Sequence, residues 1–189
     1  MGTRRLSIDP VPPIFLHAAG EGSVQEIEVP AGETRYTLHQ TGNEAAHYRF
    51  HLRQPGSKVL ITGLIKAQGE ETPSLTTETI HHTPTTLAET QLRTVAYGSA
   101  HPRYEGLIKI APGAHGCESY LNHHSLLLGE QAKSWTRPSL EIQNNEVKCS
   151  HAATVRTVTK LDLFYLRSRG LSPEEATELL VDAFTAEVA

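Results

Sequence analysis

The sequence is poor in aromatic residues, in methionine and in cysteine, and each shortage limits the fold and its setting. Only 6% of the 189 residues are aromatic, with one Met and one Trp. A core must therefore be built mostly from Val, Ile, Leu and Ala, which favours an all-β body of small repeated layers over a helical bundle. The two cysteines permit at most one disulfide, which is typical of a protein of the reducing cytoplasm.

Long apolar runs, excess basic charge and nucleotide-binding motifs are also missing. No run approaches the ~18 apolar residues that a membrane span requires, and residues 1–13 lack the apolar segment of a secretory signal. The net charge of −4 argues against nucleic acid or anionic lipid as the main partner. No phosphate loop, G-x-G-x-x-G, G-x-S-x-G or H-E-x-x-H motif occurs. We expect a cytoplasmic protein without a membrane segment, in which any ATPase is another chain.

Short apolar segments separated by turn-forming residues fill the chain from about residue 14 to 158. Apolar residues alternate clearly in residues 104–110 and 139–142, as a half-buried strand requires. No Asn-Gly or Asp-Gly hairpin signal appears, so the pattern predicts a sandwich or a parallel coil of strands. From Thr76 the segments recur at roughly 11 to 16 residues, without a fixed period that identifies a repeat. The segments are 14–16, 24–29, 36–38, 48–52, 59–65, 75–80, 87–97, 107–110, 120–128, 140–142 and 155–158.

The pattern changes to helical at about Thr159. Thr159 is a predicted N-cap with acidic Asp162 at the third helical position, and Gly170 stands where a helix C-terminus is expected. Ser172 then begins a second helix with Pro173 at its first position. The sequence therefore predicts a β core over residues 1–158 and a small helical appendage over residues 159–189. The apolar face of the second helix comprises Ala176, Leu179, Leu180, Ala183 and Phe184.

Cys149 and His151 are the leading candidates for metal chemistry. If their segment is extended, residues two apart point to the same face, and thiolate and imidazole are both ligands for iron or zinc. Two ligands are too few for a closed site, so another chain or a distant segment would have to supply the rest. The alternative is a buried thiol beside a hydrogen-bonded histidine.

Several other residues are candidates of lower rank. His81-His82 and His123-His124 are adjacent pairs, and neighbours on a strand point to opposite faces. At most one member of each pair could face a common site, so we expect structural roles for them. We expect a structural role for Cys117 as well, which follows Gly116 in a predicted loop.

A second hypothesis for metal chemistry rests on three histidines of the N-terminal β region. His39, His47 and His51 lie near a Pro-Ala-Gly turn, as in a mononuclear metal enzyme of cupin type. The closely spaced His-x-His of such enzymes is missing around His39. This alternative predicts about one bound metal ion per chain.

From about Ile80 to its C-terminus the sequence resembles the SufB/SufD family of iron–sulfur cluster assembly proteins, on the SufD side of that family. The resemblance is strongest at the cysteine–serine–histidine segment and at the Phe-Tyr-Leu helix that follows. It covers a little over half of the chain. The matching segments are YEGLIKI (104–110), SLLL (125–128), TRPSLEI (136–142), EVKCSHAATV (146–155) and LFYLRSRGL (163–171).

The resemblance implies a mainly β fold, a short right-handed parallel β-helix followed by a small C-terminal helical domain. It further implies a complex with a SufB-type subunit, or a second copy of this chain, and with the SufC ATPase. His151 and Cys149 match positions linked to interfacial iron–sulfur chemistry, so transient iron or a nascent cluster is expected there and no stably bound cofactor. The resemblance places ATPase docking in residues 159–189, with Leu163, Phe164, Tyr165, Arg169, Leu179 and Phe184 as candidate contacts.

Some positions depart from the family pattern. Ala132 stands where SufB-type chains carry their key cysteine, and Ala152 and Arg156 replace glycines. Chains of the family are usually longer, with an N-terminal helical domain that is not seen in this sequence. We therefore expect a non-catalytic scaffold subunit rather than the cluster-bearing one. A homodimeric adaptor that has lost cluster work is the remaining alternative.

Overall fold

The computed structural model describes residues 11–16 and 23–188, which form eleven strands and two helices. Most strands coincide with an apolar segment of the sequence and extend it by a few residues. The strands are β1 (Ile14–Leu16), β2 (Val24–Glu28), β3 (Glu33–Gln40), β4 (Ala45–Leu52), β5 (Lys58–Ala67), β6 (Ser74–His81), β7 (Leu87–Tyr97), β8 (Arg103–Ile110), β9 (Glu118–Leu128), β10 (Trp135–Ile142) and β11 (Lys148–Thr157).

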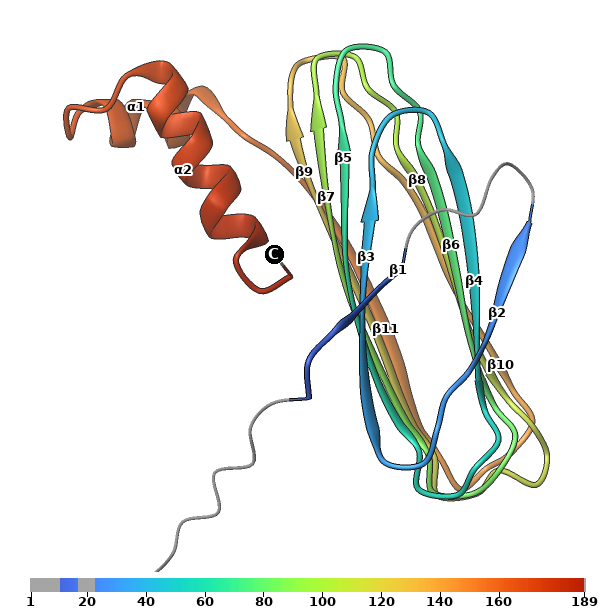
Figure 1. Cartoon of the computed structure of the whole chain (residues 1–189). Coiled ribbons are helices and arrows are strands. Elements are labelled where there is room, and N and C mark those ends of the chain that lie inside the picture. The colour runs from blue at the N-terminus through green and yellow to red at the C-terminus, as the bar shows by residue number, and fades with distance from the viewer. Residues whose placement is uncertain (1–10, 17–22, 189) are drawn as a thin grey trace, which may run out of the picture.

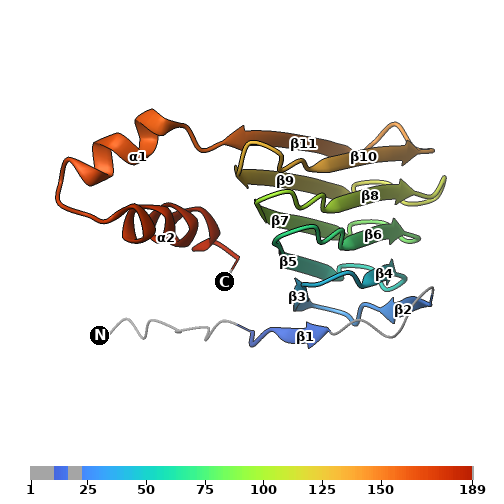
Figure 2. The same cartoon turned by 90° about the horizontal axis from the view of Figure 1, so that it is seen from above.

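The strands form two parallel sheets, and successive strands of the chain alternate between them. One sheet has the order β1-β3-β5-β7-β9-β11 and the other β10-β8-β6-β4-β2 (Figure 1). Each coil of the chain therefore adds one strand to each sheet, and the coils stack as layers (Figure 2). This arrangement is a parallel β-helix, and the expected fold class is confirmed.

The strand register shows a repeat that could not be identified from the sequence. Lys58, Leu87 and Glu118 occupy equivalent positions in three successive coils, which gives a repeat of about 30 residues. Each apolar segment of the sequence is thus half of a coil. Turns of unequal length between the strands blur the period.

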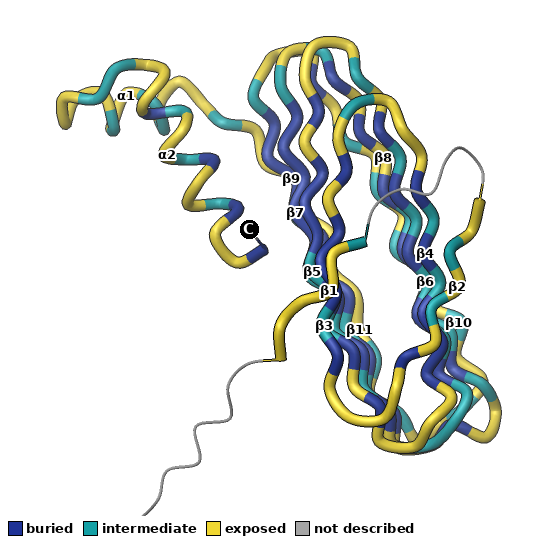
Figure 3. The backbone as a smooth tube through the Cα atoms, in the orientation of Figure 1, coloured by how far each residue is buried: buried dark blue, intermediate teal, exposed yellow. Residues whose placement is uncertain are grey.

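The core lies between the two sheets, and buried positions alternate along the inner strands (Figure 3). Apolar residues dominate it, among them Tyr48, Phe50, Ile61, Leu92 and Ile108. The few aromatic side chains suffice because each coil contributes only a thin layer of the core.

A glycine column allows the turns after β5, β7 and β9 to stack closely. Gly69 and Gly98 have positive φ angles of 61° and 64°, a conformation that favours glycine. A Cβ atom on Gly129 would lie 2.6 Å from the carbonyl oxygen of Gly98. The backbones are therefore too close for any side chain at Gly129.

The C-terminal helices begin where the sequence predicts. α1 (Lys160–Arg167) is capped by Thr159 with Asp162, and α2 (Pro173–Thr185) by Ser172 with Glu175, each as a complete capping box. Neither helix is long and apolar enough to cross a membrane.

α2 packs against the outer face of the six-stranded sheet (Figure 1). Val181 and Val188 join an apolar cluster with residues of that sheet, and Arg93 of β7 forms an ion pair with Glu187. The guanidinium of Arg93 also lies over the ring of Phe184. α1 buries no residue, so α2 is the helix that fixes the appendage to the β-helix. The sheet residues of the cluster are Leu64, Val95 and Leu126.

Candidate functional site

The last coil, formed by β10 and β11, ends the stack of layers (Figure 2). Each of these strands pairs with only one neighbour in its sheet, so one edge of each is unpaired within the described residues. Side chains at core-facing positions of this coil are open to solvent because no described coil covers them. We call the surface formed by Leu140, Ile142, Cys149, His151 and Val155 the open end.

Cys149 and His151 lie two residues apart on β11, on the same face of the strand. They pair in register with Ser119 and Leu121, both buried. Cys149 is half-buried against the core, whereas His151 is exposed. The two side chains are therefore presented together at the open end, as the extended segment predicts.

The thiol of Cys149 is less acidic than a free cysteine. Burial raises its pKa, and a hydrogen bond with the backbone of Ser119 offsets part of that effect. A thiolate is the form that binds metal. Cys149 therefore favours the protonated state unless a cation or a partner group stabilises the thiolate.

The described residues form no group of three or more His, Cys, Asp or Glu side chains that could hold a metal ion. Cys149 and His151 are thus at most two ligands of a site. A complete site at the open end therefore requires further ligands from outside the described residues, such as those of another chain.

The paired histidines are divided between core and surface, as expected. His81 is buried with its Nδ1 2.7 Å from the Thr86 hydroxyl. His123 is buried between Thr94 and Thr136, at 2.8 and 3.0 Å from their hydroxyls. Burial lowers the pKa of His81 to about 4 and that of His123 to about 3. Both are therefore neutral core residues at physiological pH.

Cys117 is a buried core thiol. Its Sγ lies 3.1 Å from the Thr86 hydroxyl and donates a hydrogen bond of 3.2 Å to the carbonyl of Thr83. These contacts support the structural role that the sequence predicts.

The cupin-type interpretation is wrong. Cupins are jelly rolls of antiparallel strands, whereas every pair among the described strands is parallel. His39 lies on the outer face of the six-stranded sheet, and His47 and His51 on the outer face of the other sheet. The core separates them, so the three imidazoles cannot share one metal ion.

His47 and His51 instead belong to an ion-pair network on β2, β4 and β6. His47 donates to Glu78 at 2.6 Å and His51 to Glu26 at 2.7 Å. Arg49 bridges both carboxylates, and its hydrogen bond is the largest cause of the lowered pKa of Glu78. These partners come from neighbouring coils, so no local signal in the sequence points to them.

The expected ATPase contacts differ in accessibility. Phe164 and Tyr165 are 67% and 59% exposed, and Arg169 lies over the Tyr165 ring. Leu179 is exposed and Leu163 is half-buried. Leu161, which the sequence analysis did not select, extends this surface. The apolar surface of the helices comprises Leu161, Phe164, Tyr165 and Leu179, and we call it the helix patch.

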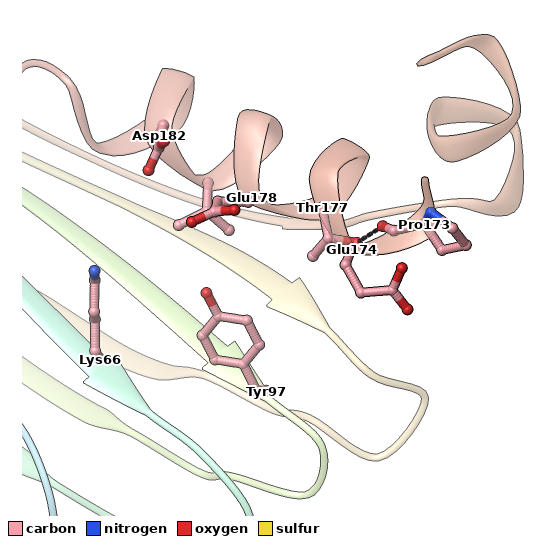
Figure 4. A pocket seen from close by; sticks show the side chains of 8 residues that line it. Lys66, Tyr97, Pro173, Glu174, Thr177, Glu178 and Asp182 are labelled. Atoms are coloured by element: carbon pink, nitrogen blue, oxygen red, sulfur yellow. Dashed lines mark hydrogen bonds between the residues drawn. The ribbon is translucent and has the colours of Figure 1, made fainter. Parts of the chain in front are cut away.

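Phe184 faces the β-helix and contacts Arg93, so it helps to hold α2 in place. A cavity of about 440 Å³ lies between one side of α2 and the strands β5 and β7 (Figure 4). Lys66 and Tyr97 of the strands face carboxylates of α2 across this space. Burial and the charges of Asp182 and Glu178 raise the pKa of Tyr97.

Residues 33–184 match the family described as "SUF system FeS cluster assembly, SufBD core domain". The chain belongs to the SufBD family. The matched region begins with β3 and ends within α2, so the SufBD core domain includes the open end and both helices.

Relatives in the SufBD family include two proteins named SufD. The chain is 36% identical to the iron–sulfur cluster assembly protein SufD of Escherichia coli over 96 residues, 51% of this chain and 23% of that protein. It is 33% identical to SufD of Bacillus subtilis over 125 residues, 66% of this chain and 29% of that protein. An iron–sulfur cluster assembly SufBD family protein of Mycobacterium bovis is 36% identical over 110 residues, 58% of this chain and 13% of that protein. The chain thus spans less than a third of the length of these relatives.

Proposed function

We propose that this chain is a SufD-like scaffold subunit of iron–sulfur cluster assembly. In this proposal the open end pairs with a SufB-type chain, and the helix patch docks a SufC-type ATPase. Membership of the SufBD family and the likeness to two SufD proteins support the assembly role.

The observation that carries the proposal is the exposure of core-facing residues on the last coil. Val155 is 49% exposed, and Leu140 and Ile142 are exposed on the facing strand. Covering such side chains stabilises a complex by about 25 cal/mol per Å² of apolar surface. The unpaired edges of β10 and β11 offer backbone hydrogen bonds to a strand of another chain. A partner that presents a similar β-helix end satisfies both needs.

Iron and sulfide are cargo in this proposal. Cys149 and His151 would supply one thiolate and one imidazole at the interface between the two chains. The SufB-type chain would supply the remaining ligands. A ligand set divided between chains holds metal only while they are paired. The isolated chain is then expected to contain little iron. The ATPase cycle, acting on the helices, would move the interface between the two chains.

The proposal assigns no catalytic residue to this chain. Its ionisable side chains at the open end are one thiol and one imidazole, without a carboxylate among the residues that define that surface. ATP hydrolysis belongs to the docked subunit.

Substitutions in the helix patch test the docking. Phe164→Ala and Tyr165→Ala remove exposed rings, so the fold should be unchanged within about 0.5 kcal/mol. We expect each to weaken binding of a purified SufC-type ATPase at least tenfold in surface plasmon resonance. Lys160→Ala, on the same helix outside the patch, is the control. Equal affinity for all variants would contradict docking through the patch.

Cluster assembly tests the role of the open end. The complex of this chain with the SufB-type subunit and the ATPase is supplied with iron, sulfide and ATP under anaerobic conditions, and cluster absorbance is followed. His151→Ala should lower the yield several-fold, whereas His115→Ala should not, because His115 lies in the turn before β9. An unchanged yield in His151→Ala would favour an adaptor without cluster work.

A further inference from the structure

A pocket lies among the turns that connect β5 to β6, β7 to β8 and β9 to β10, at the top of Figure 1. Its volume is about 570 Å³, within the ~300–1,000 Å³ usual for small-molecule sites. Backbone hydrogen bonds from His101 to Glu71 and from Lys133 to Ala100, at 2.9 and 3.0 Å, hold the three turns in register. The pocket is thus a preformed part of the stacked coils.

The lining of this pocket is basic. It contains Arg103, Lys133 and His101, Thr72 and Ser134 with their hydroxyls, and no carboxylate; the Ser134 hydroxyl also lies 2.8 Å from that of Ser125. This is notable in a chain of net charge −4. An anion entering the pocket would meet positive charge and hydroxyl donors without a negatively charged competitor.

Arg103 and Lys133 form no ion pair or side-chain hydrogen bond with any described residue. The arginines at 35, 49, 53, 93, 137 and 156 all form ion pairs with carboxylates. The N–H donors of Arg103 and Lys133 therefore remain available. Arginine and lysine are the residues that most often bind phosphate groups in proteins.

Trp135 gives the pocket an aromatic wall and positions Arg103. It pairs with Arg103 in the β10–β8 register, and the guanidinium carbon lies 4.6 Å from its ring centroid. This cation–π contact leaves the guanidinium N–H groups free. The guanidinium carbon of Arg137 lies 5.5 Å from the same centroid, and Trp135 is 39% exposed, so the part of its ring that neither arginine covers can contact a ligand. The pocket combines phosphate-binding cations with a surface for a planar ring.

We propose that this pocket binds a phosphorylated small molecule with a planar ring, of the nucleoside monophosphate class. Arg103 and Lys133 contact the phosphate oxygens, and the exposed part of Trp135 contacts the ring. The site lies on the turns, apart from the residues of the open end and of the helix patch, and does not depend on the proposed assembly role.

Trp135 is the only tryptophan of the chain, so its fluorescence reports on this pocket directly. We would titrate the full chain with AMP, inorganic phosphate and adenosine at low salt, and repeat the AMP titration by calorimetry. AMP should quench the fluorescence saturably, with adenosine and phosphate each binding at least tenfold more weakly. Phosphate binding as tightly as AMP would overturn the role of the ring.

Charge variants distinguish binding in this pocket from nonspecific electrostatic attraction of AMP to the protein. Arg103→Gln with Lys133→Gln should weaken AMP binding at least tenfold. Lys58→Gln with Lys66→Gln removes the same charge from β5, where neither lysine forms an ion pair with a described residue, and should change it less than twofold. Equal losses in both double variants would overturn the proposal. The proposal would also be overturned if an acidic peptide bound to the pocket while millimolar AMP caused no change in fluorescence.

Discussion

His151 of β11 lies opposite Leu121 of β9, so an exposed imidazole stands one coil above a leucine that is 2% exposed. The two side chains occupy equivalent core-facing positions. They differ in exposure because one coil is covered by the next and the other is the last. A core-facing position that remains open is typical of a surface that another chain covers.

The thiols test this difference between coils. We expect Cys149 to react slowly with a thiol reagent in the folded protein, because burial raises its pKa and the thiolate is the reactive form. Cys117, which is fully buried, should react only after denaturation. Cys149→Ser and Cys117→Ser assign the two phases. A Cys117 that reacts as fast as Cys149 would contradict its buried position just before β9.

The glycine column predicts unequal effects of two alanine substitutions. Gly129→Ala places a Cβ atom 2.6 Å from the backbone oxygen of Gly98 and should lower the free energy of unfolding by about 2–3 kcal/mol. Gly113→Ala meets no atom within 4 Å and should change it by less than about 1 kcal/mol. Urea denaturation measures both. Equal stability of the two variants would show that the turns are not stacked this closely.

The buried histidines predict a loss of stability in mild acid. The pKa values of His81 and His123 fall to about 4 and about 3 in the folded protein, but lie near 6.5 in the unfolded chain. The unfolded state therefore binds more protons below pH 6.5. Stability is full above that pH and declines as the pH falls towards 4. Between pH 7 and 5 the free energy of unfolding should fall by about 4 kcal/mol, about half of it from each histidine.

Denaturation at several pH values checks this decline. Carboxylates titrate mostly below about pH 4.5, which separates their effect from that of the histidines. His123→Asn should flatten the decline by about half, whereas His101→Asn, at an exposed position, should not. A wild-type stability that stays constant from pH 7 to 5 would contradict the neutral buried state.

The two faces of α2 predict opposite phenotypes for two neighbouring substitutions. Val181→Ala removes buried methyl groups and should weaken the packing of α2 by about 2 kcal/mol, seen as faster amide hydrogen exchange in that helix. Leu179→Ala, on the exposed face, should leave exchange unchanged and weaken ATPase binding. The reverse result would mean that α2 packs on the sheet by its other face.

Much of the fold was predictable because its signals are local. The capping residues Thr159 and Ser172 fixed both helix starts, and β7 coincides with a segment expected from apolar residues alone. The pairing of strands was not predictable from spacing, because turns of unequal length hide the repeat. The spacing left a sandwich and a parallel coil of strands open, and the resemblance to a known family selected the parallel β-helix.

The candidate site was predictable in part, because some of its signals are also local in the sequence. Alternation along β11 placed Cys149 and His151 on one face, but their location at an open end depends on the order of the coils. The carboxylate partners of His47 and His51 come from other coils, so the local sequence could not exclude the alternative hypothesis in which these histidines bind metal. Phe184 belongs to the apolar face of the second helix, as its spacing predicts. Its contact with Arg93 of β7 was not predictable, because the two residues are far apart in the sequence.

Pairing at the open end is the central claim, and purification from the native host tests it most directly. Tagged wild type, Val155→Glu and Ala152→Glu, expressed at native abundance, are isolated anaerobically and the co-purifying chains identified by mass spectrometry. Val155 faces the open end, whereas Ala152 points to the outer face of the same strand. We predict that wild type and Ala152→Glu retain a SufB-type chain and a SufC-type ATPase, and that Val155→Glu loses the SufB-type chain and keeps the ATPase. Recovery of the wild-type chain alone, or of the same partners with Val155→Glu, would contradict the account.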